Sequence, residues 1–310
     1  MSSKQLLRLV MVLGAALLLW GAVALASRRT DTDSELHSIL PKIDTSAIDT
    51  VVFAAPADTA MLVRLRAKAG WQVNGHTAEP QTVADLLRGL ADTEQTPELV
   101  ARSPSSHARL SVSDDSGRRV RLMSRGRTVA DFIAGKQSVE TGGIYLRKSG
   151  APEVYVLRGT LANSLGRSSD EWRNHTIAQV TPDSVAAIAI SRGGKSYSLK
   201  RRGATWSFAS GAPADSAKVA GLLTSSRDIK ASGFGTKAQQ DSLGGKPRRT
   251  ARLLDRRGSA FLSLAFDSTK SGLWVRVSPP LPGEAGSEAY RLEEWTADQL
   301  TPPDSSLRKH

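Results

Sequence analysis

The chain reads LVRLRAKAGWQVNGHTAEPQTVADLLRGL at residues 62–90 and SYSLKRRGATWSFASGAPADSAKVAGLL at residues 196–223, and the pattern that these stretches share decides the fold. In both, an alternating apolar and polar segment leads to a tryptophan, Trp71 or Trp206, and then to an amphipathic helix pattern. A fixed spacing relates the apolar helix positions, which are Val83, Leu86 and Leu87 in the first stretch and Val219, Leu222 and Leu223 in the second. An ordered series of this kind indicates an internal duplication.

The correspondence extends in both directions with small insertions. Val63 and Leu65 align with Tyr197 and Leu199 on the N-terminal side. Three matches follow on the C-terminal side: Ala108-Arg109-Leu110 with Ala251-Arg252-Leu253, Gly143–Arg147 with Gly272–Arg276, and Tyr155 with Tyr290. We therefore predict two homologous units.

Each unit is expected to contain strands and one main helix. Val83, Leu86, Leu87 and Leu90 recur at helical spacing and form one apolar stripe, and Pro80 suits the first helical turn. Alternation predicts further strands at 50–55, 61–67, 108–114, 119–124, 144–148 and 153–157 in the first unit and at 186–191, 195–201, 250–255, 260–267, 272–278 and 289–292 in the second. One helix cannot cover so many strands, so the sheet should curl or pack on itself or on its twin. The predicted fold class is α+β with mostly antiparallel sheet.

The N-terminal segment favours a membrane location. Residues 9–26 form an uncharged apolar run that, with the residues just before it, can cross a bilayer core as a helix. Lys4 and Arg8 precede this run and indicate a cytoplasmic start, although two arginines that follow it weaken the signal. Ala24-Leu25-Ala26 fits a signal-peptide cleavage site, which is the alternative. Both interpretations export the remainder. We expect a single-pass protein of the cell inner membrane, with its C-terminal domain in the periplasm or extracytoplasmic space.

These observations predict an order of parts along the chain. We expect an N-terminal membrane anchor or signal peptide at 1–29, a linker at 30–43, the first repeat unit at 44–160, an inter-unit joint at 161–182, the second unit at 183–296 and a flexible tail at 297–310.

Composition limits the available chemistry. The chain has no cysteine, which excludes disulfides, thiolate metal sites and a cysteine nucleophile. Its net charge of +12 includes basic clusters at expected hairpin ends, such as Arg118-Arg119-Arg121 and Arg256-Arg257. These clusters fit either a solvated rim or a surface that faces anionic envelope polymers or lipids. Nucleic acid is not an expected partner, because the clusters lie outside the cytoplasm.

The sequence offers no recognisable catalytic or metal site. Its five histidines show no metal-ligand spacing, and His76 falls in an expected turn. Asp114-Asp115 precedes a Ser-Gly hairpin turn, and the chain has no nucleophile elbow, Walker loop or dinucleotide fingerprint. Paired carboxylates that meet only in space stay an open alternative, which would make the protein a hydrolase. We otherwise expect no catalytic residue, no metal and no cofactor.

The tryptophans and the helix leucines are the structural candidates. Trp71 and Trp206 stand at equivalent strand positions, where core packing is a better explanation than a ligand platform. They stand beside the apolar helix stripes, whose Leu86, Leu87, Leu222 and Leu223 are also structural candidates. Trp172, in Asp170-Glu171-Trp172-Arg173, is interpreted as a wedge between the units.

Several segments resemble a known bacterial family. LVARSPSSHARLSVSDDSGRRVRL, IAGKQS, GGIYLRKSGAPEVYVL, DEWRNHTI and PADSAKVAGLL together are similar to the family catalogued as domain of unknown function 4340, although the region after Asp228 is less typical. The resemblance implies a short membrane anchor before a repeated, β-rich exported region. It also implies an association with gliding-motility-type ABC transporter auxiliary components. It brings no catalytic residues.

Two functions follow as expectations. The first is a non-enzymatic, membrane-anchored scaffold that is auxiliary to an ABC-type transport or motility assembly. The second is a module that binds anionic envelope polymers or lipids.

Overall fold

The computed structural model describes residues 43–66, 69–92, 97–243, 246–270, 272–284 and 288–309, which divide into two compact units. The first unit holds the described residues up to Asn74 together with Pro80–Trp172. The second holds Gly75–Glu79 and the described residues from Arg173 onward. The predicted anchor at 1–29 and nearly all of the linker lie outside the described residues. Within those residues, no helix has the length and apolar character needed to cross a membrane.

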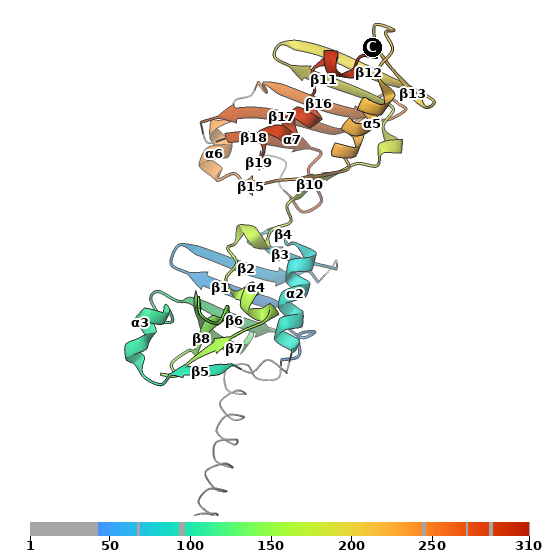
Figure 1. Cartoon of the computed structure of the whole chain (residues 1–310). Helices are drawn as coiled ribbons and strands as arrows, with labels where there is room; N and C mark the ends of the chain where they lie inside the picture. The colour runs from blue at the N-terminus through green and yellow to red at the C-terminus, as the bar shows by residue number, and fades with distance from the viewer. Residues whose placement is uncertain are drawn as a thin grey trace, which may run out of the picture. The chain divides into compact units, whose positions relative to one another are not determined.

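The first sheet has nine strands in the order β4-β3-β2-β1-β6-β7-β8-β9-β5 (Figure 1). The bounds are β1 Thr50–Ala55, β2 Asp58–Arg64, β3 Trp71–Val73, β4 His76–Thr77, β5 Glu98–Ala101, β6 Arg118–Ser124, β7 Arg127–Gln137, β8 Ile144–Lys148 and β9 Val154–Leu157. The strand β4 falls in the segment that belongs to the second compact unit. Along this order, the neighbouring pairs from β3–β2 through β1–β6 to β8–β9 are antiparallel.

Two helices cover one face of this sheet. The main helix α2 (Pro80–Ala91) packs against the shorter α4 (Thr160–Leu165). Alternate strand residues such as Phe53, Leu62 and Leu122 are fully buried because every second side chain points toward the helices. The remaining helical segments of this unit are η1 Pro104–Ser106, α3 His107–Leu110 and η2 Asp170–Trp172.

The second sheet has eight strands in the order β13-β12-β11-β16-β17-β18-β19-β15, and β10 pairs with β14 separately. Its strands are β11 Ala187–Arg192, β12 Lys195–Arg202, β13 Thr205–Phe208, β15 Gly233–Phe234, β16 Arg249–Leu254, β17 Ala260–Thr269, β18 Gly272–Ser278 and β19 Ala289–Leu292, with β10 at Thr176–Gln179 and β14 at Asp228–Lys230. The helical segments are η3 Pro182–Ser184, α5 Ser216–Ser225, α6 Lys237–Ser242, α7 Glu294–Leu300 and η4 Asp304–Leu307.

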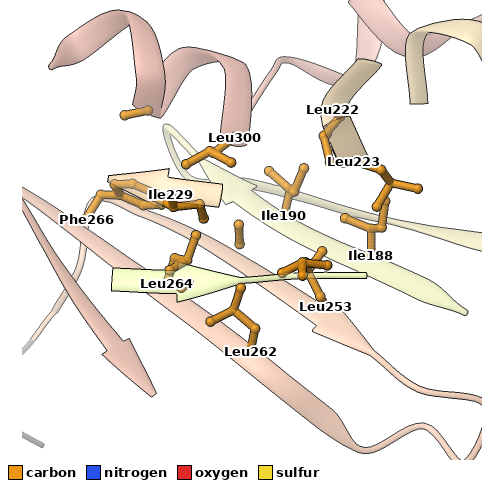
Figure 2. Close-up of a cluster of buried hydrophobic side chains, with 14 of the residues drawn as sticks. Ile188, Ile190, Leu222, Leu223, Ile229, Leu253, Leu262, Leu264, Phe266 and Leu300 are labelled. Carbon is orange, nitrogen blue, oxygen red and sulfur yellow. The ribbon is translucent and has the colours of Figure 1, made fainter. Parts of the chain in front are cut away.

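The core of the second unit lies between the sheet and the helices α5 and α7. Figure 2 shows Leu222 and Leu223 of α5 and Leu300 of α7 directed toward Ile190 and Ile188 of β11. All five side chains are at most 5% exposed. The α5 stripe therefore packs as its spacing predicts.

The two sheets confirm the α+β class and the antiparallel arrangement, and they share one strand order. From one side of each sheet to the other, the order β3-β2-β1-β6-β7-β8-β9-β5 in the first unit corresponds to β13-β12-β11-β16-β17-β18-β19-β15 in the second, with β1 equivalent to β11. Leu146 pairs with Tyr155 as Val275 pairs with Tyr290, so the predicted match of the two tyrosines holds in the hydrogen-bonded register. A bulge also interrupts the ladder at the same point, after Leu122 and after Leu253.

Three of the predicted correspondences are wrong. Tyr197 pairs with Ile190 as Ala60 pairs with Phe53, so Tyr197 is the counterpart of Ala60 and not of Val63. Leu199 is the counterpart of Leu62 and not of Leu65. Leu62 pairs with Val51 of β1, and Leu199 pairs with Ile188, the equivalent residue of β11. A longer connection between β2 and β3 breaks the constant spacing. Ala108–Leu110 does not correspond to Ala251–Leu253: the predicted strand at 108–114 is helix α3 at its start, and the counterpart of β16 is β6.

The segments predicted as an inter-unit joint at 161–182 and a flexible tail at 297–310 both contain packed helical residues, and the boundary between the two compact units, at Trp172 and Arg173, falls inside the first of these segments. Residues 297–309 contain most of α7 and all of η4, and Leu300 and Leu307 are 2% and 3% exposed in the core. The first repeat has the same closing segment, with α4 in the place of α7 and η2 in the place of η4. An isolated bridge follows each, Ala78 with Arg173 and Ala214 with Arg308. Both segments therefore belong to a repeat, and their few apolar side chains pack in its core.

Candidate functional site

Each sheet has an outer face formed by the side chains that alternate with the core residues. In the first unit, Val52 lies beside Met61 on one neighbouring strand and beside Arg121 on the other. Met61 is 45% exposed, and Arg121 is also exposed. This outer patch of Val52, Met61 and Arg121 combines apolar and cationic side chains, and Asp131 lies opposite Arg121 on β7. Methionine and arginine are enriched in protein interfaces relative to the rest of the surface.

The second unit carries the equivalent position with different neighbours. Ala189 lies beside Ser198 and Arg252, in the same register as Val52 with Met61 and Arg121. Arg252 is exposed and is therefore the structural counterpart of Arg121.

A groove of about 610 Å³ includes this part of the second unit. Its lining includes Ser196, Ser198, Arg252 and Arg308, and it also includes Asp304, whose carboxylate accepts from Arg308 Nη2 at 2.8 Å. The Arg308 guanidinium lies 5.2 Å from the Phe208 ring centre. Hydroxyl and guanidinium groups in one groove can donate hydrogen bonds to phosphate, carboxylate or sugar oxygens.

A second candidate is a buried ionic cluster in the second unit, formed by His76, Arg173, Glu284 and Glu288. Strand β4 supplies His76, the segment before β10 supplies Arg173, and the residues before β19 supply the glutamates. The side chains of Glu284 and Glu288 are 8% and 4% exposed, whereas His76 is 32% exposed. Buried carboxylates of this kind need charged or hydrogen-bonding partners.

The two carboxylates are held in the same way. One oxygen of each is fixed by a donor: the Thr77 amide donates to Glu284 Oε1 at 2.9 Å, and Arg173 Nη2 donates to Glu288 Oε1 at 2.5 Å. The other oxygen of each faces His76 Nδ1, at 3.0 Å for Glu284 Oε2 and 3.5 Å for Glu288 Oε2. One nitrogen and two oxygens therefore converge.

Because the two glutamates lie close together, their pKa values shift in opposite directions. Burial raises the pKa of Glu288, and its hydrogen bond with Glu284 raises that pKa further. Burial acts in the same direction on Glu284, but hydrogen bonds from Glu288, His76 and the Thr77 amide outweigh it and lower the pKa of Glu284. The pair is therefore suited to share one proton, with Glu284 as the carboxylate.

Two aromatic side chains contact the buried part of the cluster. The Arg173 guanidinium carbon lies 3.5 Å from the centre of the Phe234 ring. The Tyr290 hydroxyl donates to Glu288 Oε2 at 3.4 Å, and burial raises the pKa of this hydroxyl. The surroundings thus strengthen electrostatic interactions, because the local dielectric is low.

The structural candidates from the sequence lie in both units and form no single site. Trp206, Leu86, Leu222 and Leu223 are buried, whereas Leu87 and Trp71 are only partly buried. Arg64 lies over the Trp71 ring at 4.9 Å.

Trp172 has a different environment from the one predicted. It is fully buried inside the first unit, where its ring stacks on Phe53 at a centroid distance of 5.1 Å. Its counterpart Leu307 is buried in the second unit, so a core position explains this residue in both repeats.

Sequence reasoning missed the ionic cluster. His76 was expected in a solvated turn, but it contacts glutamates more than 200 positions away. Local spacing carries no signal for such a contact, because it depends on the tertiary fold.

The comparisons with known proteins give one match. The family model for the domain of unknown function DUF4340 matches residues 71–247, which is more than half of the chain and includes parts of both repeats. Neither the curated proteins nor the solved structures gave a match.

Proposed function

This chain belongs to the family of the domain of unknown function DUF4340, and from that premise we propose that it is a non-enzymatic, membrane-anchored accessory protein. It would hold its two repeats outside the cytoplasm and dock onto an ABC-type transport or motility assembly. The apolar run at residues 9–26 supports the anchor.

The outer patch of Val52, Met61 and Arg121 carries this proposal. A methionine at 45% exposure in the middle of a regular sheet gains nothing from packing against its own core. Exposed Val129, at 40%, lies on the neighbouring strand β7. Methionine and arginine are enriched in protein interfaces, so this face suits a protein partner.

The test is co-purification of the full chain from its native membranes in a mild detergent. We expect the wild type to recover membrane subunits of a transporter, and Met61→Asp to lose them. Val139→Asp is the control, since Val139 is fully exposed and lies after β7, outside the strands β1, β2 and β6 that form this patch. Recovery of the wild type as an isolated monomer, after cross-linking in intact cells, would contradict the proposal.

The groove of the second unit favours a second candidate function, the binding of anionic envelope polymers or lipids. Arg252 and Arg308 line it together with several serines, and since Asp304 in the same groove pairs with Arg308, Arg252 is the arginine on which this candidate depends. Binding of the full chain to vesicles that contain anionic lipid should weaken as salt rises, because counterions screen exposed charges.

A charge reversal separates groove binding from nonspecific attraction. Arg252→Glu should reduce vesicle binding more than Arg227→Glu, which makes the same charge change at an exposed residue outside the groove. Equal losses in the two variants would mean that net charge alone drives the binding.

The hydrolase alternative has less support. The structure does bring two carboxylates together in Glu284 and Glu288, but their side chains are almost fully buried. A substrate would have to displace the surrounding aromatic and arginine groups to reach them.

A further inference from the structure

We propose that His76, Glu284 and Glu288 bind a divalent transition-metal cation of the Zn²⁺ class. The bound ion would fasten the segment Gly75–Glu79 to the residues that lead into β19 within the second unit. This inference is independent of the docking function proposed above.

The ligand atoms have the separations that such an ion requires. Bonds of about 2.0–2.1 Å in a tetrahedral site place neighbouring ligand atoms about 3.3–3.4 Å apart. Here His76 Nδ1 lies 3.0 Å from Glu284 Oε2 and 3.5 Å from Glu288 Oε2. All three ligand atoms lie within 4.8 Å of one another, so small adjustments suffice.

The second shell is already in place. The Thr77 amide and Arg173 each hold the distal oxygen of one glutamate. The proximal oxygens face the histidine, and each also has a second neighbour: Arg173 Nη2 lies 3.7 Å from Glu284 Oε2, and the Tyr290 hydroxyl donates to Glu288 Oε2 at 3.4 Å. Metal-bound carboxylates in proteins are usually oriented by such outer hydrogen bonds.

The charge of the cluster also favours a cation. Two carboxylates oppose one arginine in a site where both glutamate side chains are at least nine-tenths buried. A divalent ion satisfies both converging oxygens at once. The mixture of one imidazole and two carboxylates suits Zn²⁺ or Mn²⁺ better than Mg²⁺ or Ca²⁺, which favour oxygen ligands alone.

The test is calorimetric titration of the metal-stripped full chain in detergent with Zn²⁺. We expect one ion per chain, with at least about 100-fold weaker binding in Glu284→Gln and in His76→Ala, since each loses a direct ligand and even outer-shell changes cost about 10–100-fold. His107→Ala is the control, because His107 lies in the first unit and contacts the Pro152 carbonyl. Excess Mg²⁺ should not displace the ion.

A measurement on the unmodified protein covers the case in which a variant fails to fold. X-ray absorption at the zinc edge of the wild-type complex should show one imidazole and two carboxylate ligands. Absence of the imidazole would overturn the proposal. So would no stoichiometric binding by the wild type, or equal affinity in the wild type and in folded Glu284→Gln.

Discussion

Replacing Trp172 by alanine tests whether this residue belongs to the core of the first unit. The side chain is fully buried and stacks on Phe53 with an interplanar angle of 21°. A buried tryptophan removes about 150–250 Å² from water, worth about 4–6 kcal/mol at about 25 cal/mol/Å² as an upper bound. Measured losses for such truncations are about 3–5 kcal/mol, and we expect Trp172→Ala to lower the free energy of unfolding by that amount.

Trp172→Phe separates packing from hydrogen bonding. The indole Nε1 is buried and has no hydrogen-bond partner within the described part of the chain. Such an unsatisfied donor costs about 1–3 kcal/mol. Phenylalanine keeps the stack on Phe53 and removes the donor, so the relief offsets much of the lost area. We expect Trp172→Phe to stay within about 1 kcal/mol of the wild type.

The assay is urea unfolding of the full chain in detergent, followed by far-UV circular dichroism. Leu307→Ala serves as the matched change in the second unit and should cost about 2–5 kcal/mol. A loss below about 1 kcal/mol for Trp172→Ala would refute the core assignment. Equal losses for the alanine and phenylalanine variants would show instead that the indole N–H contributes to stability.

Two further predictions concern stability. Gly89→Ala should destabilise the protein by about 1–3 kcal/mol in urea unfolding, because the added Cβ would lie 2.9 Å from the Leu161 backbone. At Gly221 an added Cβ meets open space, so Gly221→Ala should stabilise the protein by up to about 1 kcal/mol through helix propensity. The hydrogen bonds from Arg119 lower the pKa of Asp131, so their contribution is present above the ordinary aspartate pKa and is lost as the pH falls through the lowered value. Asp131→Asn should therefore unfold at lower urea than the wild type at pH 6 and lose this difference at strongly acidic pH.

Local patterns predicted much of the fold because they depend on a few neighbouring residues. The stripe of Val219, Leu222 and Leu223 and the strands near residues 186–191 and 272–278 needed only periodicity. The strand β7 was missed because a bulge breaks its alternation where Met123 pairs with Thr128. The positions of bulges and the lengths of the connections depend on how a strand pairs with its partner. Hydrophobic periodicity does not reveal that pairing.

The candidate sites were less predictable than the fold. The basic cluster that contains Arg121 was visible in the sequence, but its place opposite Val52 required the strand register. Predicting the contact between His76 and Glu284 required the complete tertiary fold, because closing a loop of that length leaves no signal in the local sequence pattern.

A comparison of the two repeats distinguishes the positions at which the fold constrains the residue type from the positions at which it does not. At core positions the residues stay apolar in both copies, as in Phe53 and Ile190, because each must fill a helix-covered interior. On the outer face, Met61 has become Ser198, so this surface tolerates a complete change of polarity without losing the strand order. Arginine nevertheless occupies the equivalent outer position in both copies, at Arg121 and Arg252. The cross-strand neighbours of the two arginines differ, since Arg121 lies opposite Asp131 and Arg252 lies opposite Ser263, so the arginine is retained without a constant partner inside the sheet.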